Sequence, residues 1–152
     1  MAVIQDTYND APGRGYPGMV VNMEPSDRLS RTVEDAAGVA FGKAAFRGTG
    51  DRGCTATPAA GGELGFVIAD HGQPLLPGGT ADTIPRYESA AIINRGVVCV
   101  TVGAAVEAGD DVYVTPAGVI TNADGAGANI AMVGWVFDET AANGAVCAVA
   151  RR

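Results

Sequence analysis

Charge, histidine and cysteine are all scarce in this chain of 152 residues. Charged residues make up 18% of it, with ten basic against 17 acidic side chains and a formal net charge of -7. A protein that binds nucleic acid directly normally presents a basic patch, and the longest basic run here is Arg151-Arg152. The shortage of basic residues therefore argues against direct contact with nucleic acid.

Long apolar runs are lacking as well. No segment approaches the roughly 20 apolar residues that a membrane-spanning helix needs. Residues 1–10 have neither the charged nor the apolar region of a signal peptide. We therefore expect no membrane contact, and synthesis in a reducing cytoplasm.

The residues that usually build active sites are few and scattered. The single histidine, His71, belongs to no nucleophile motif, and Cys54, Cys99 and Cys147 are far apart and lack a C-x-x-C spacing. Asp110-Asp111 has the composition of a turn. We therefore expect no enzyme activity, no catalytic residues, no cofactor and no metal site.

What the chain has in quantity is glycine and β-branched residues. Residues 97–102 form a nearly unbroken β-branched run between Gly96 and Gly103, which predicts a strand covered on both faces. Turn residues follow at 109–111 and 115–118. We predict that residues 89–121 form the central antiparallel meander of the domain.

Further strands are predicted on both sides of that stretch. Long loops are expected at 48–62 and 71–85, and Val133, Trp135 and Phe137 are expected on one side of their strand. Leu29 and Val33 suit either one helical turn or an edge strand. No long amphipathic helix is apparent, so the sequence predicts an all-β fold, a compact antiparallel β-barrel or jelly-roll-like sandwich. The additional predicted strands cover residues 39–47, 65–70, 130–137 and 145–150.

The beginning of the chain differs from the rest in composition. Residues 8–18 hold three glycines, two prolines and two tyrosines, a composition that forms neither a helix nor a central strand. We predict an extended N-terminal arm and lead-in at residues 1–36 and one all-β domain at 37–152. The arm either orders against a neighbouring subunit, which we favour, or frays, or wraps its own domain. The contact residues that we expect are Tyr8, Tyr16, Pro17, Met19, Val20 and Met23.

Several segments of the chain, taken in their order along the sequence, resemble the structural cement, or capsid decoration, proteins of tailed bacteriophages. The resemblance is most specific from Arg95 to Gly103, followed by Val106, 108–110 and 112–113. The chain departs from the pattern at Cys99, where a bulkier residue is common, and at Glu139-Thr140. The other segments that carry the resemblance are 17–19, 30–35, 65–68, 85–91, 137–138 and Gly144.

The resemblance implies a non-enzymatic protein on the outer surface of the phage head. Such proteins clamp neighbouring major capsid proteins and associate as small oligomers, so the implied partners are the major capsid protein and further copies of the chain, as a homodimer or homotrimer. Two alternatives stay open at this stage. One is a tail or head-fibre component, and the other is a small ligand-binding β-barrel that uses residues 71–85 as a lid.

Overall fold

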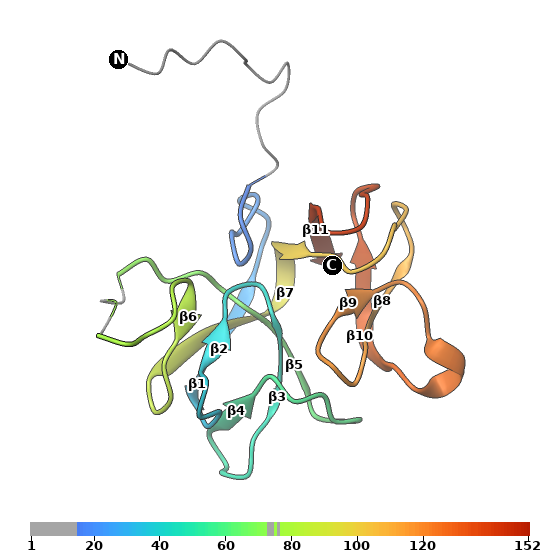
Figure 1. Ribbon diagram of the computed structural model, residues 1–152. Coiled ribbons are helices and arrows are strands. Elements are labelled where there is room, and N and C mark those ends of the chain that lie inside the picture. The colour runs from blue at the N-terminus through green and yellow to red at the C-terminus, as the bar shows by residue number, and fades with distance from the viewer. Residues whose placement is uncertain (1–14, 73–74, 76) are drawn as a thin grey trace, which may run out of the picture.

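The computed structural model describes residues 15–72, 75 and 77–152 (Figure 1). Regular structure within these ranges consists of strands and one 3-10 turn, η1 (Gly125–Gly127), which confirms the prediction of an all-β fold. In chain order the strands are β1 (Asp27–Val33), β2 (Val39–Ala40), β3 (Ala44–Arg47), β4 (Gly53–Thr55), β5 (Glu63–Val67), β6 (Thr83–Ile84), β7 (Ser89–Thr101), β8 (Asp111–Val114), β9 (Ile120–Thr121), β10 (Ile130–Phe137) and β11 (Val146–Arg151).

Strand β7 is 13 residues long and belongs to two curled sheets. Its first half pairs with β5 on one side and with β1 on the other, so the order β1-β4-β3-β5-β7 closes on itself. We call this closed unit the first barrel. In Figure 1 it occupies the lower left, with β7 crossing from it toward the other half of the molecule.

The second half of β7 pairs with β11, and the sheet continues through β10, β8 and β9. Val102, just beyond β7, forms a parallel bridge with Ile120, and the N–H of Gly103 donates to the Ile120 carbonyl at 2.8 Å. The sheet therefore curls back onto the end of β7. We call this unit the second barrel.

A glycine marks the change of partners within β7. Gly96 has φ +125°, and a Cβ placed on it would lie 2.9 Å from both the Ser26 Cβ and the Ile93 Cδ1. Glycine is the residue that accepts such a conformation without strain. It lets one strand leave the first barrel and enter the second.

Apolar side chains fill both barrels and the junction between them. Val33, Val67 and Ile92 belong to the core of the first barrel, and each is fully buried. The rings of Phe66 in β5 and Trp135 in β10 meet edge to face with centroids 4.8 Å apart. Their contact joins the two barrels into one packed body.

Three predictions about pairing and segmentation need correction. The β8–β9 hairpin forms as expected, but β7 pairs with β11 and β5 instead of β8, so the predicted meander is wrong. A central strand has hydrogen-bonding partners along both of its edges, and here those partners come from distant parts of the chain. The predicted strand 39–47 is divided at Gly42, whose φ of +71° ends β2 before β3 begins. The predicted loops 48–62 and 71–85 contain β4 and β6.

Two further predictions concern individual strands. Residues 27–33 form a strand, β1, so the single helical turn is excluded there. Val133 is 70% exposed, while Trp135 and Phe137 are buried. Gly134 has φ +80° and lies where the register of β10 against β8 shifts. The alternation of buried and exposed side chains is interrupted at this β-bulge. The prediction that Val133 shares their side is therefore wrong.

Candidate contact surface

Residues 18–21, in the described part of the arm, lie along the second half of β7. The Gly18 N–H donates to the Cys99 carbonyl at 2.8 Å, and the Cys99 N–H donates to the Met19 carbonyl at 2.8 Å. The Val21 N–H reaches the Val97 carbonyl at 3.2 Å. Residues 18–21 therefore add a short paired segment to the protein's own sheet.

Gly18 allows this segment to cross close to the first barrel. Its φ is +82°, and its carbonyl accepts a hydrogen bond from the Ala69 N–H at 2.9 Å. A Cβ at Gly18 would lie 2.6 Å from that same nitrogen, closer than real side chains approach. The backbone of the arm is thus held between β7 and the end of β5.

The six predicted contact residues differ in exposure. Tyr8 lies outside the described residues. Pro17, Met19 and Val20 are partly buried against the body, whereas Tyr16 is 44% exposed and Met23 fully exposed. Their role in contacting a capsid or another subunit stays a prediction.

Tyr16 lies at one end of a row of hollows on the surface of the first barrel. Its ring meets the imidazole of His71 at a centroid distance of 5.0 Å, and His71 in turn meets Phe41 at 5.7 Å. A hollow of about 490 Å³ opens beside this aromatic group and is lined on its far side by residues 80–83. Side chains from the arm, the β2–β3 turn and the β5–β6 loop therefore build one site.

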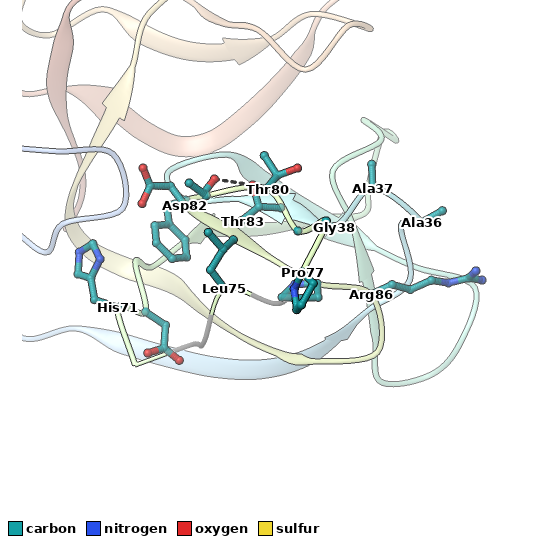
Figure 2. A pocket seen from close by; sticks show the side chains of 16 residues that line it. Ala36, Ala37, Gly38, His71, Leu75, Pro77, Thr80, Asp82, Thr83 and Arg86 are labelled. Carbon is teal, nitrogen blue, oxygen red and sulfur yellow. Dashed lines mark hydrogen bonds between the residues drawn. The ribbon is translucent and has the colours of Figure 1, made fainter.

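The row continues on the other side of residues 80–83. A second hollow, of about 510 Å³, has His71 at one end and Arg86 at the other (Figure 2). A third, of about 610 Å³, begins at Arg86 and extends past Tyr87 to Glu34. Because neighbouring hollows share lining residues, we treat them as one surface and call it the trough.

Polar side chains fix the walls of the third hollow. The Glu34 carboxylate accepts the N–H of Gly50 at 2.8 Å and both the N–H and the hydroxyl of Thr49 at 2.7 Å. These hydrogen bonds, that from Gly50 first, hold the pKa of Glu34 below its usual value. Asp35 likewise accepts the Thr55 hydroxyl at 2.6 Å and the Ala56 N–H at 2.7 Å. Both carboxylates are thus engaged by the protein's own loops.

An exposed aromatic residue stands at the far end of the trough. Tyr87 has φ +70° and a relative exposure of 72%, and the Arg86 guanidinium lies 4.6 Å from the centre of its ring. Sequence reasoning did not single out this turn as a contact site. The only signal was its presence in the segment 85–91 of the resemblance, because no local pattern predicts a left-handed tyrosine.

The C-terminal residue of the chain also holds the arm in place through an ion pair. The Arg152 guanidinium pairs with Glu24 at 3.1 Å and with Asp138 at 2.9 Å. Its hydrogen bonds to Asp138 hold the pKa of that carboxyl below its usual value. The last residue of the chain is therefore tied both to the arm and to the residue that follows β10.

Other kinds of site find no support in the described part of the chain. It contains no group of three or more histidine, cysteine or acidic side chains arranged to hold a metal ion. Nor does any helix within it have the length and apolarity to cross a membrane. The aromatic groups and hollows are what remains as a candidate site.

Comparisons with known proteins show the family and the fold of this chain. Residues 4–152 match the family model described as structural cement protein (E217 gp24/Pam3 gp6). A chain from the solved capsid of Myoviridae phage XM1 has the same fold, with a TM-score of 0.71 and 22% sequence identity over 99% of this chain and 98% of that one. A search of curated proteins finds no match. Because the family model spans nearly the whole sequence, this chain belongs to the structural cement proteins of phages.

Proposed function

We propose that this chain binds the outer surface of an assembled phage head and joins neighbouring major capsid proteins. The observation that carries the proposal is the family match over residues 4–152. The shape of the molecule supports it, because two barrels share one strand and exposed aromatic residues lie at both ends of the trough. The protein acts by contact and carries out no reaction.

The protein strengthens the shell by adding an interface that spans neighbouring capsid proteins. Packed DNA pushes a shell outward, and a subunit that spans two capsid proteins adds buried surface that must be lost before they separate. A stable interface buries roughly 1,600 Å² in total. Many copies on one shell multiply a modest affinity into a large gain in resistance.

The arm and the trough supply contacts of different kinds. The arm offers Tyr16 and Met23 from a segment already paired to β7, so little of its conformational entropy is lost on binding. The contact residues Pro17, Met19 and Val20 hold that segment in place. Further copies of the chain, in a homodimer or homotrimer, complete the proposed set of partners, and a net charge of -7 keeps the protein away from the packaged DNA.

Shells that lack this protein provide the test. Purified protein is added to them, and shell rupture is followed with temperature and with guanidinium. We expect saturable binding and a higher rupture temperature. Undecorated shells that bind none of the protein, or that bind it and rupture at the same temperature, would overturn the proposal.

A further inference from the structure

The backbone at Tyr87 is held in a conformation that bulky residues seldom adopt. Its φ is +70°, in the left-handed region where a Cβ crowds the following carbonyl. Such outliers are energetically costly and persist where the surroundings enforce them. Glycine or asparagine would form this turn more easily, so the presence of tyrosine calls for a reason other than folding.

Two backbone hydrogen bonds enforce the conformation. The Tyr87 N–H donates to the Val33 carbonyl at 2.8 Å, and the Val33 N–H donates to the Glu88 carbonyl at 2.9 Å. Val33 itself is fully buried in the core of the first barrel. The turn is therefore fixed to the barrel, and it presents the Tyr87 ring to solvent.

Charged side chains of both signs line the third hollow around the ring. The carboxylates of Glu34 and Asp35 accept hydrogen bonds from their own loops. Within the described ranges, neither Arg47 nor Arg86 forms an ion pair with a carboxylate. The carboxylates keep their negative charge, and the nearby Arg86 contributes, after the hydrogen bond from Gly50, to the lowered pKa of Glu34. What the third hollow offers a partner is thus an aromatic face beside two guanidinium groups that no carboxylate of the described chain pairs with directly.

The turn lies at the end of β7 opposite the arm. Tyr87 precedes Ser89, the first residue of β7, whereas the arm bridges Val98 near its other end. A strand rises about 3.3 Å per residue, so up to about 30 Å of β7 separates the two surfaces. The link between β6 and β7 accordingly lies well away from the blue segment of the arm in Figure 1.

We propose that Arg86 and Tyr87, with Arg47 beside them, form a second contact point for the shell, which binds a capsid-protein segment presenting a carboxylate next to an apolar side chain. This inference rests on the function proposed above and deepens it. A protein that joins two capsid subunits needs two separated surfaces, and the arm is only one. Tyrosine and arginine are also the side chains most often found at the energetic centre of protein interfaces.

The first variant removes the ring and keeps the turn. Tyr87→Gly accepts the left-handed conformation, so its melting temperature should equal or exceed that of the wild type. We expect its affinity for undecorated shells to fall at least tenfold. Val133→Ala trims an equally exposed apolar residue on the second barrel and should bind like the wild type.

The second variant tests the charge. Arg86→Glu should lose more affinity than Tyr87→Gly, because it places a carboxylate against a carboxylate. Arg52→Glu makes the same change in net charge at another exposed loop and should bind like the wild type. Wild-type binding should weaken as salt increases, and that dependence should be shallower in Arg86→Ala.

The outcomes separate this inference from the function on which it rests. If the wild type binds shells and both Tyr87→Gly and Arg86→Glu bind equally well, the second contact point is wrong and the proposed function stands. Were Tyr87→Gly to change only the oligomeric state in solution, the turn would bind a second copy and the proposal would again be wrong. A wild type that fails to bind shells overturns both.

Discussion

The backbone N–H of Gly18 donates to the carbonyl oxygen of Cys99 across 2.8 Å, which places the arm on the strand that both barrels share. Cys99 is buried, and a Cβ at Gly15 would lie 3.3 Å from its sulfur. The short side chain of Cys99 leaves room for the arm backbone at Gly15. The arm and β7 are thus fitted to each other at this point.

Gly18→Ala should destabilise the protein strongly. The new Cβ would meet the Ala69 nitrogen at 2.6 Å and would also force alanine to φ +82°. We expect the free energy of unfolding to fall by about 2 kcal/mol or more in a urea titration. Gly144→Ala is the matched control, because its φ is +80° and nothing lies within 4 Å. This control variant should lose only the free energy of unfolding that the left-handed backbone of alanine costs, about 1–2 kcal/mol. An equal loss in both variants would show that the close approach at Gly18 is unimportant.

Phe66→Ala should loosen the junction between the barrels. The variant removes one ring of the edge-to-face pair with Trp135 and leaves a cavity, for an expected loss of about 3–5 kcal/mol in unfolding free energy. Val133→Ala, on the same strand as Trp135, should change stability by about 0.5 kcal/mol or less. A loss for Phe66→Ala as small as that for Val133→Ala would contradict the packed junction.

Glu34 should make stability depend on pH in the acidic range. Its pKa is lowered in the folded protein by hydrogen bonds from Gly50 and Thr49. Its stabilising contribution is therefore complete above the unfolded-state value, near 4.5, and is lost as pH falls through the lower folded-state pKa. Asp110 and Asp138, whose pKa values are also lowered, act in the same direction.

Glu34→Gln tests this contribution separately. Unfolding midpoints measured from pH 6 downward should fall less steeply in the variant than in the wild type, because the variant lacks one of these three carboxyl groups with a lowered pKa. The side-chain amide also cannot accept hydrogen bonds at both of its terminal atoms, so the amide proton of Gly50 or of Thr49 should exchange faster. Parallel pH profiles for the two proteins would contradict the assignment.

Arg152→Met should release Asp138 from its ion pair. The pKa of Asp138, followed by NMR titration, should rise toward its ordinary value because the hydrogen bonds from Arg152 are lost. The effect on unfolding free energy should be small, since the side chains of this ion pair are partly exposed. An unchanged Asp138 pKa would mean that the ion pair does not form in solution.

The sequence predicted the parts of this structure that depend on local chemistry. The β-branched run at 97–102 lies almost wholly within β7, and the turn predicted at 115–118 joins β8 to β9, because both signals come from a few adjacent residues. Pairing partners were not predictable in the same way. Strand β11 reaches β7 from more than 40 residues away, and only the packing of the whole core selects it.

The candidate site was predicted less well than the fold. Composition identified the arm, but it could not show that residues 18–21 pair with the protein's own β7. Tyr87 escaped notice because its exposure and left-handed backbone are set by hydrogen bonds to Val33, which is distant in sequence. The trough joins the arm, the β2–β3 turn and the links on either side of β6, and no single motif contains them.

The most direct measurement is a reconstruction, by electron microscopy, of undecorated shells incubated with this protein. The account predicts density for the two-barrel body on the outer surface, with the arm against one capsid subunit and the Tyr87 turn against another. Density confined to the tail or to the inside of the shell, or none at saturating protein, would contradict it.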